Sequence, residues 1–144
     1  MLPKSDWAKL IPHAGTMCLL DVVCSWDERQ IHARSAGHAR ADNPLRSEQG
    51  LHVVHLAEYG AQAMAVHGAL LARSRGAEEV RPGMLVSLRD VHLMAEYVDQ
   101  LNGDLDVHGE CLYAADGGAQ YAFRVEHRGQ LLASGRAAVI HPAR

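Results

Sequence analysis

The 144-residue sequence is poor in cysteine. Its three cysteines, Cys18, Cys24 and Cys111, include no Cys-x-x-Cys pair. An odd number without that spacing argues against a disulfide framework and against a zinc ribbon. We therefore expect the three thiols to be buried as small hydrophobic side chains.

Aromatic residues and excess charge are also scarce. Only 5% of the residues are aromatic and the formal net charge is -3, whereas a general nucleic-acid-binding protein needs a basic surface. The longest apolar run is interrupted by His55 and Glu58, and residues 1–11 include Lys4, Asp6 and Lys9, so we expect neither a membrane-spanning helix nor a secretory signal. The sequence therefore predicts a cytoplasmic protein with no nucleic-acid or membrane partner.

The composition is typical of one globular domain, since 48% of the residues are hydrophobic and 22% are charged. Its central feature is the segment 52–73, HVVHLAEYGAQAMAVHGALLAR, which has helical length and predicts a helix buried nearly all round. At 100° per residue, His55, Glu58 and Gln62 fall within roughly 60° of one another. Because an unpaired buried charge is costly, these polar groups either bond to neighbouring backbone or line a site.

The remaining pattern predicts an α+β fold, in which one antiparallel sheet of about six strands curls around the long helix. We expect Tyr121, Phe123 and Val125 to lie opposite Val139, Ala137 and Gly135 in a hairpin. The other expected elements are a short helix at Ser5–Ile11 capped by Ser5, strands at Met17–Trp26, Gln30–Ser35, Met84–Val98, Leu105–Ala115, Ala119–His127 and Leu131–His141, and a loop at Gly37–Gly50.

A sheet of this size covers only part of the helix, so a second chain is the simplest way to close the open side. In such a dimer the polar stripe of one helix meets the loop of the other chain in a groove between subunits. This arrangement makes Glu58 a site candidate.

Three stretches resemble a known family. The run Ile11–Val23, IPHAGTMCLLDVV, is similar to the opening motif of the β-hydroxyacyl-acyl carrier protein dehydratases, and Glu58–Ala63, EYGAQA, is similar to the Glu-Ala-x-Ala-Gln-Ala of their central helix. The segments Asn43–Arg46 and Glu58–Gly68 resemble dehydratase-like hotdog proteins of aryl polyene pigment clusters. The resemblance runs from about residue 11 to residue 140 and implies one hotdog domain spanning residues 1–144.

The resemblance implies loss of water from a 3-hydroxyacyl thioester carried on the phosphopantetheine of acyl carrier protein or on coenzyme A, with no further cofactor. This reaction requires a base, an acid and an oxyanion donor in one cavity. In the family, a His in a His-Phe-x-Gly loop is the base, and a helix carboxylate, matched here by Glu58, assists the leaving hydroxyl. Gln62 matches the residue that supports the carboxylate, and a backbone N–H near the helix N-terminus holds the carbonyl oxygen.

The sequence departs from the family at the base. Residues 41–46 read ADNPLR, so Asn43 or Pro44 stands near the position of the family's histidine, and an amide does not abstract a proton at neutral pH. His55, which shares the stripe with Glu58, is the foremost substitute, followed by His52 and His38. We therefore predict Glu58 and His55 as catalytic residues. The predicted substrate-binding residues are Asn43, Gln62, His13 and His52, with a structural role as the alternative for His13.

We expect no metal site, because His52, His55 and Glu58 span about 120° of a helix and the family resemblance implies no metal. A basic rim at Arg73, Arg75 and Arg81 would suit an acidic carrier protein, although a solvated helix end is the more common explanation.

Three functions remain open: a hydro-lyase, a thioesterase in which Glu58 activates water, and a non-catalytic hotdog subunit that pairs with an active dehydratase. Loss of the loop histidine favours the non-catalytic subunit, whereas retention of Glu58 and Gln62 in an apolar helix favours an enzyme. The expected assembly is a homodimer or a heterodimer with another hotdog chain.

Overall fold

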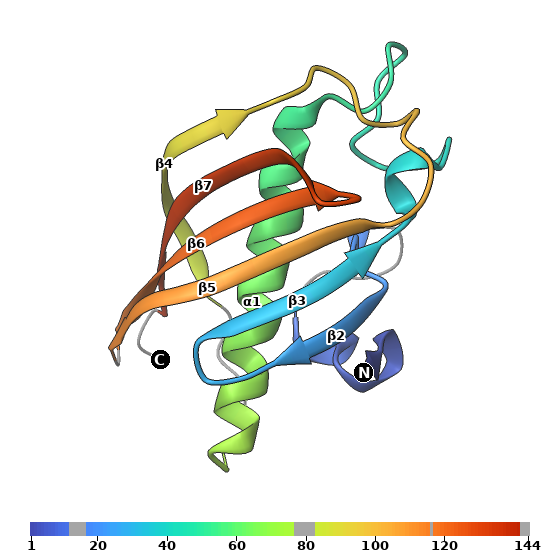
Figure 1. Ribbon diagram of the computed structural model, residues 1–144. Helices are drawn as coiled ribbons and strands as arrows, with labels where there is room; N and C mark the ends of the chain where they lie inside the picture. The colour runs from blue at the N-terminus through green and yellow to red at the C-terminus, as the bar shows by residue number, and fades with distance from the viewer. Residues whose placement is uncertain (12–16, 77–82, 116, 142–144) are drawn as a thin grey trace.

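A computed structural model describes residues 1–11, 17–76, 83–115 and 117–141 of the chain. Within these residues one antiparallel sheet of seven strands curves around a long helix, α1 (Leu56–Ser74) (Figure 1). The strands are β1 (Leu2–Pro3), β2 (Val22–Trp26), β3 (Gln30–Ser35), β4 (Met84–Leu93), β5 (Leu105–Ala115), β6 (Gly118–His127) and β7 (Gln130–Ile140), in the spatial order β1-β2-β3-β5-β6-β7-β4. This is the hotdog arrangement, so the predicted α+β fold is confirmed.

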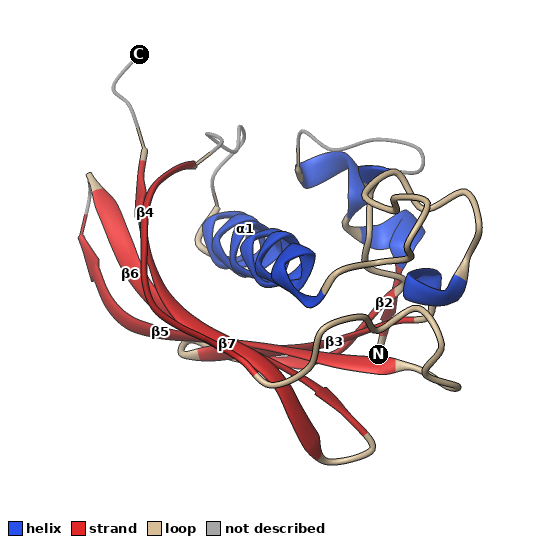
Figure 2. Ribbon diagram, turned by 90° about the horizontal axis from the view of Figure 1, so that it is seen from above, coloured by secondary structure: helices blue, strands red, loops and turns tan. Residues whose placement is uncertain are grey.

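Side-chain alternation explains how the sheet wraps the helix. Successive residues of a strand point to opposite faces, so Val107 and Val125 are buried toward α1 while their neighbours His108 and Arg124 lie on the outer face. Viewed along the helix, the sheet forms a trough with α1 inside it, and the N-terminal turns and loops lie on one flank (Figure 2).

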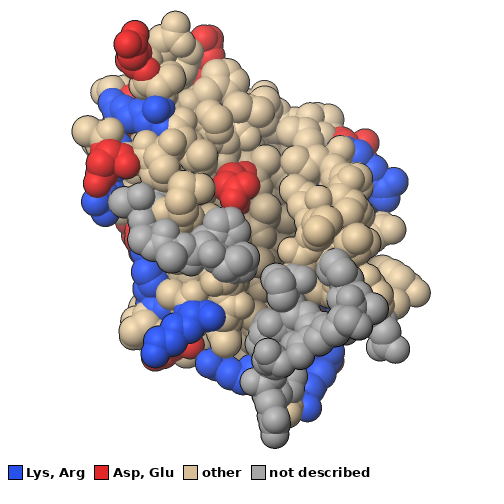
Figure 3. All heavy atoms as spheres, turned by 180° about the vertical axis from the view of Figure 1, so that it is seen from behind, with Lys and Arg blue, Asp and Glu red and all other residues tan. Residues whose placement is uncertain are grey.

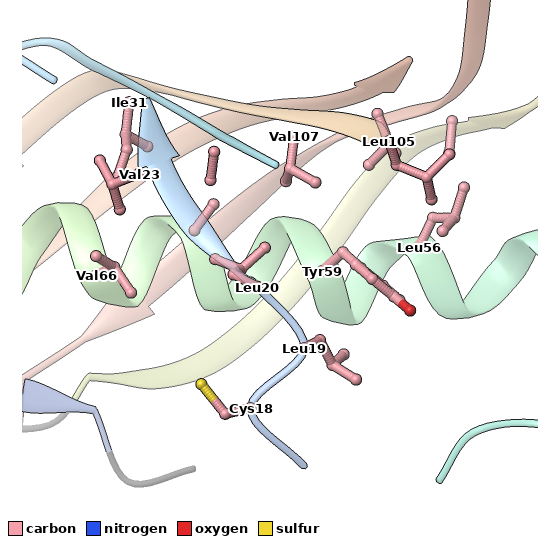
Figure 4. Close-up of a cluster of buried hydrophobic side chains, with 14 of the residues drawn as sticks. Cys18, Leu19, Leu20, Val23, Ile31, Leu56, Tyr59, Val66, Leu105 and Val107 are labelled. Carbon is pink, nitrogen blue, oxygen red and sulfur yellow. The ribbon is translucent and has the colours of Figure 1, made fainter. Parts of the chain in front are cut away.

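The main core lies between α1, the first half of the sheet and the segment that precedes β2. Figure 4 shows Tyr59 and Val66 of the helix near Leu19 and Leu20 of that segment, with Ile31 and other sheet residues across from them. A second, smaller cluster joins α1 to β6 and β7 and consists of Met64, Tyr121, Phe123 and Ala137. The N-terminal half of the molecule therefore holds most of the buried apolar surface.

One side of α1 is not covered. Ala57, Glu58, Ala61, Ala65 and Gly68 are only partly buried, and at 100° per residue they lie within about 100° of one another. We call these five residues the open stripe of α1. Residues 56–70 are all buried or partly buried, so most of the helix circumference is buried as predicted, and the open stripe is the side that the sheet and the N-terminal segment leave partly exposed.

The two edges of the sheet differ strongly. β1 is two residues long and contains Pro3, which limits further strand pairing. β4, at the other edge, is ten residues long and exposed along its whole length. Its exposed side chains are mostly apolar, including Val86, Leu88 and Val91. An edge of this kind offers a template on which another chain can pair.

Several predicted bounds are confirmed and others are corrected. Gln30–Ser35 and Leu105–Ala115 are strands as predicted. The strand expected at Met17–Trp26 begins only at Val22, because Leu19 N donates to the Gln62 side chain and Leu19 O accepts from Ser35 Oγ, outside a strand ladder.

The strand expected at Met84–Val98 is also shorter and ends at Leu93. Beyond it, Glu96 O accepts from Val53 N, and Val98 N donates to Leu51 O. The chain therefore leaves the sheet in order to hold the segment that leads into α1.

The helix begins later than predicted. A single 3₁₀ turn, η5 (Val53–His55), precedes α1, and the His52 ring accepts a hydrogen bond from Val54 N. Near the N-terminus, the helix expected at Ser5–Ile11 is instead two 3₁₀ turns, η1 (Lys4–Asp6) and η2 (Ala8–Leu10), without a capping bond from Ser5. None of the helices in the described part of the chain has the length and apolar character needed to cross a membrane.

The β6–β7 register differs from the prediction by two residues. Tyr121, Phe123 and Val125 pair with Ala137, Gly135 and Ala133. The turn holds only Arg128 and Gly129, both at positive φ, between the paired residues His127 and Gln130. This two-residue turn matches the twist of a hairpin, and a shift of two residues keeps the same side chains on the core face.

Candidate functional site

Glu58 lies in the first turn of α1, on the open stripe. Its neighbours on the stripe, Ala57 and Ala61, have small side chains, and Glu58 itself is partly buried. Figure 3 views the helix side of the molecule, where uncharged residues surround one acidic group near the middle and most other charged side chains lie around the rim. Glu58 is thus the acidic residue of the partly exposed stripe, and its catalytic role remains a prediction.

The two predicted histidines lie immediately before α1. His52 Nδ1 accepts from Val54 N at 3.0 Å, and the His52 ring makes an edge contact with Tyr97 at a centroid distance of 5.4 Å. This geometry gives His52 a capping role. His55 is partly exposed, ends η5 and stands at the N-cap of α1, one turn before Glu58, but its side chain makes no capping hydrogen bond. Its role as a base remains a prediction.

The backbone N–H groups before α1 already have acceptors. Val53 N donates to Glu96 O at 2.7 Å, Val54 N to the His52 ring, and His55 N to His52 O at 3.1 Å. The next group, Leu56 N, donates to Val53 O and Val54 O. These four N–H groups are therefore engaged within the chain, so an oxyanion donor has to come from elsewhere.

Gln62 is fully buried and joins the helix to the segment before β2. Its Oε1 accepts from Leu19 N at 2.8 Å, and its Nε2 donates to Met17 O at 2.7 Å. The amide thus satisfies two backbone groups that lie outside the sheet ladder. Of the two roles expected for the polar groups of the helix, Gln62 thus has the first, bonding to neighbouring backbone. That Gln62 also supports a catalytic carboxylate remains a prediction.

Asn43 stands near the position of the family's loop histidine and has a buried structural environment. Its Nδ2 donates to Gly37 O and to Tyr59 Oη, both at 3.0 Å, and its Oδ1 accepts from Leu45 N at 2.9 Å. Burial raises the pKa of Tyr59, and the hydrogen bond from Asn43 opposes that rise. The amide is therefore used to hold the loop against α1, and its predicted contact with substrate is untested.

A pocket of about 260 Å³ opens beside this loop, with Asn43 and Pro44 in its wall. Its charged groups are paired with one another, since Arg40 contacts Asp42 at 2.9 Å and Lys4 contacts Asp21 at 3.7 Å. The wall of this pocket contains no histidine among the described residues. Among the described residues, the loop thus borders a cavity whose wall offers no imidazole as a base.

His38, a further substitute considered for the base, is almost completely buried in the turn η4 (Gly37–Ala39). Its Nε2 donates to Leu101 O at 2.8 Å because a carbonyl oxygen only accepts, and its buried Nδ1 has no hydrogen-bond partner. His13, the remaining predicted binding residue, lies outside the described residues. Among those residues, no group of three His, Cys, Asp or Glu side chains is placed to hold a metal ion.

One buried polar pair was not predicted from the sequence. His67 Nε2 donates to Asp27 O at 2.7 Å, so its Nδ1 is bare and accepts from Tyr121 Oη at 2.6 Å. Burial lowers the pKa of His67 and raises that of Tyr121. The sequence features that could have indicated this pair are a histidine within an apolar helix, His67, and a tyrosine on the inner face of a strand, Tyr121.

The sequence matches the model of a family described as ApeP-like, ApeP dehydratase, over residues 5–144. The chain belongs to the ApeP-like dehydratase family. The predicted kinship with dehydratase-like hotdog proteins of aryl polyene clusters is thereby confirmed. A search of curated proteins finds no match.

Solved structures similar to this ApeP-like chain support the fold. The dehydratase heterocomplex ApeI:P from Xenorhabdus doucetiae matches with a TM-score of 0.85 and 21% identity, over 100% of this chain and 93% of that chain. A mutant of the thioesterase SAV0944 from Staphylococcus aureus matches with a TM-score of 0.63 and 14% identity, over 84% and 93%. A hypothetical thioesterase with coenzyme A from Streptococcus pneumoniae gives a TM-score of 0.63 and 10% identity, over 85% and 86%.

Proposed function

We propose that this chain is one subunit of a two-chain hotdog dehydratase that removes water from a 3-hydroxyacyl thioester of aryl polyene synthesis. In this proposal Glu58 is the acid, and a histidine in the loop of a second hotdog chain is the base. The acyl group is carried on phosphopantetheine of acyl carrier protein or on coenzyme A. The expected cytoplasmic setting belongs to the same proposal.

The observation that carries the proposal is the contrast between Asn43 and Glu58. The loop that holds the base in the related enzymes here presents an amide whose oxygen and nitrogen bond to Leu45, Gly37 and Tyr59. Glu58, the residue that matches the family's helix carboxylate, lies on the partly exposed stripe of α1. In a site between two chains, this chain would contribute the Glu58 carboxylate as the acid. The other chain would contribute the loop histidine as the base, in place of Asn43.

The chemistry can be divided between two subunits. The partner's base removes the proton from C2, the C2–C3 double bond forms, and the bond from C3 to the hydroxyl oxygen breaks as the protonated Glu58 donates its proton to that oxygen. Water leaves, and the proton on the base returns to Glu58 before the next turnover. The oxyanion donor for the thioester carbonyl is also assigned to the partner, because the N–H groups of residues 53–56 are engaged.

The edge strand β4 is the proposed pairing surface. It is exposed along all ten residues, and exposed apolar side chains are costly unless another surface covers them. Pairing β4 with the edge strand of a second hotdog sheet would satisfy its outward backbone groups and cover Val86, Leu88 and Val91. The heterocomplex described for the ApeI:P structure makes a second hotdog chain the partner that we favour over a second copy.

Reconstitution tests the proposal directly. The chain would be purified alone and after co-expression with a hotdog subunit that carries a His-Phe-x-Gly loop, and both samples would be assayed with a 3-hydroxyacyl-pantetheine thioester. We expect stable co-purification and water loss by the pair alone. Equal turnover by the isolated chain would show that the base lies within this chain, and His55→Gln would then test the sequence prediction.

The thioesterase alternative is favoured only by the fold shared with proteins named thioesterases. Product analysis in the same assay separates the two reactions. Dehydration yields an unsaturated thioester of mass lower by one water, whereas hydrolysis releases a free thiol and a carboxylic acid. Thiol release by the isolated chain, abolished by Glu58→Gln, would replace our proposal with the thioesterase.

A further inference from the structure

A second titratable cluster lies on the outer face of the sheet, away from α1 and from Glu58. His32 of β3 and His108 of β5 are directly opposite each other in the antiparallel pair. Their rings stack with a centroid distance of 4.4 Å and an interplanar angle of 11°. Such close, parallel contact places any charge on one ring against the face of the other.

Each ring has a carboxylate of its own. His32 Nε2 lies 2.7 Å from Asp106 Oδ1, and His108 Nε2 lies 3.3 Å from Glu126 Oε1. Because an ionised carboxylate only accepts, His32 Nε2 carries the hydrogen of the bond to Asp106, which leaves His32 Nδ1 as the atom that gains a proton in acid. The bond to Asp106 holds the His32 ring in the stacked arrangement, and the Glu126 carboxylate lies beside the His108 ring.

Two arginines complete the cluster and neutralise the carboxylates. Arg34 Nε lies 3.1 Å from Asp106 Oδ1, and Arg124 Nε lies 3.7 Å from Glu126 Oε2. Burial opposes ionisation of Asp106, but the hydrogen bonds from His32 and Arg34 outweigh it and lower the pKa of Asp106. The charges of these two arginines and two carboxylates balance, so a proton on either ring gives the six side chains a net positive charge.

We propose that His32 and His108 act as one coupled proton-binding unit, which takes up a single proton in mildly acidic solution where two independent histidines would take up two. The first proton on either ring lies about 4.4 Å from the other ring and repels the second. The unit makes the pairing of β3 with β5 sensitive to pH. This property is independent of the proposed dehydratase site.

The groups that face this pair come from every strand beside it. Cys24 on β2 and Asp104 before β5 lie near Arg34, and Arg124 and Glu126 face His108 from β6. Burial, followed by the charges of Arg124 and His32, lowers the pKa of His108, while Glu126 and Asp106 oppose that shift. The positive charge of Arg124 thus disfavours protonation of His108, the ring that stacks on His32.

The sign of the effect on stability follows from this lowered pKa. The unfolded chain binds a proton at its ordinary pKa of about 6.5, whereas the folded chain resists protonation of His108. Folding stability is therefore complete above pH 6.5 and is lost as the pH falls from there through the folded pKa. Protonation of the unit weakens the sheet in acid.

Histidine titration by NMR tests the coupling. In the whole chain, the ring signals of His32 and His108 should respond to each other's protonation, and His32→Gln should move the titration midpoint of His108 to higher pH by about half a unit or more, because a neighbouring charge is removed. The matched control is His92→Gln, which changes a histidine of the same face on β4, with β6 and β7 between it and β5. The control should leave the His108 midpoint unchanged.

Thermal unfolding from pH 7.5 to pH 5.0 supplies a second reading. The His32→Gln and His108→Gln variants should each lose less thermal stability over this range than the natural chain, by roughly 2 to 4 °C. Two results would overturn the proposal: a His108 midpoint that is the same in the natural chain and in His32→Gln, or two histidines that each bind a full proton independently. If His32→Gln does not fold, the NMR titration of His108 would be repeated in His32→Asn, and that of His32 would be measured in His108→Gln.

Discussion

The two sides of α1 are built differently. On the side that faces the N-terminal segment, Gln62 and Tyr59 are fully buried and each has a defined hydrogen-bond partner within the chain. On the open stripe, Glu58 is partly exposed among small side chains, and the nearest edge strand, β4, is exposed throughout. The first side packs against the N-terminal segment of this chain, whereas the second is the side to which our proposal assigns the other hotdog chain. Polar residues one turn apart on a helix can thus serve different purposes.

Glu58→Gln is expected to have the largest effect. If the open stripe carries the acid, this change should lower dehydration by the reconstituted pair by about 10²-fold or more and leave the fold intact, because the amide occupies the same volume and does not donate an acidic proton. Turnover and thermal unfolding would be measured on the same preparation. Loss of folding with unchanged turnover per folded molecule would assign Glu58 to the stabilising side instead.

Gln62→Leu tests the other half of the comparison. It should cost roughly 2 to 4 kcal/mol of unfolding free energy, because Leu19 N and Met17 O lose their partners in the interior. Denaturant unfolding measures this cost, and the activity per folded molecule should fall much less than in Glu58→Gln. A stable Gln62→Leu protein with abolished turnover would place Gln62 in the catalytic site.

Gly60→Ala tests how closely the helix approaches the sheet. A Cβ at this position would lie 2.6 Å from two ring atoms of Phe123, which itself fills the space above Gly135. We expect a loss of roughly 1 to 3 kcal/mol, since either the ring or the helix must move. The control is Gly68→Ala, where the added Cβ meets nothing within 4 Å and the helical propensity of alanine should be neutral or stabilising. Equal effects of both changes in thermal unfolding would contradict this packing.

The double change Val86→Lys and Leu88→Lys addresses the exposed edge. Both side chains are already exposed, at 51% and 41%, so the isolated chain should stay folded. Pairing with a second hotdog chain should weaken at least tenfold, about 1.4 kcal/mol, because two charges would be buried against an apolar surface. Titration by analytical ultracentrifugation measures this loss. Tyr113→Lys, at a residue 66% exposed on β5, is the control, and equal weakening by it would argue against β4 as the pairing edge.

The smallest expected effect is a pH dependence that comes from His67. Burial lowers its pKa in the folded chain, so its contribution to stability is complete above pH 6.5 and is lost as the pH falls from there through the folded pKa. In His67→Gln, which removes the titrating group, the slope of unfolding free energy against pH between 6.5 and 5 should be shallower than in the natural chain. An identical slope in both proteins would show that His67 does not titrate differently on folding.

Local pattern was enough to predict most of the elements. Alternating side chains and short Gly-containing turns gave the bounds of β3 and β5, and the apolar run at 52–73 gave the helix to within a few residues. The ends of the strands expected at Met17–Trp26 and Met84–Val98 were missed, because distant residues such as Gln62 and Leu51 take their backbone groups. Such competition is decided by residues far away in the sequence and leaves no local signal.

The sequence by itself determined the fold class, the family and the identity of the polar residues in the central helix, since these follow from periodicity and from motifs along the chain. The tertiary structure decided what each residue does. It buried Gln62 against Met17 and Leu19 and Asn43 against Tyr59, while it left Glu58 on the open stripe. The physical reason is that a helix position specifies a direction only, whereas the packed neighbours in that direction determine whether a polar group is satisfied, exposed or available to another chain.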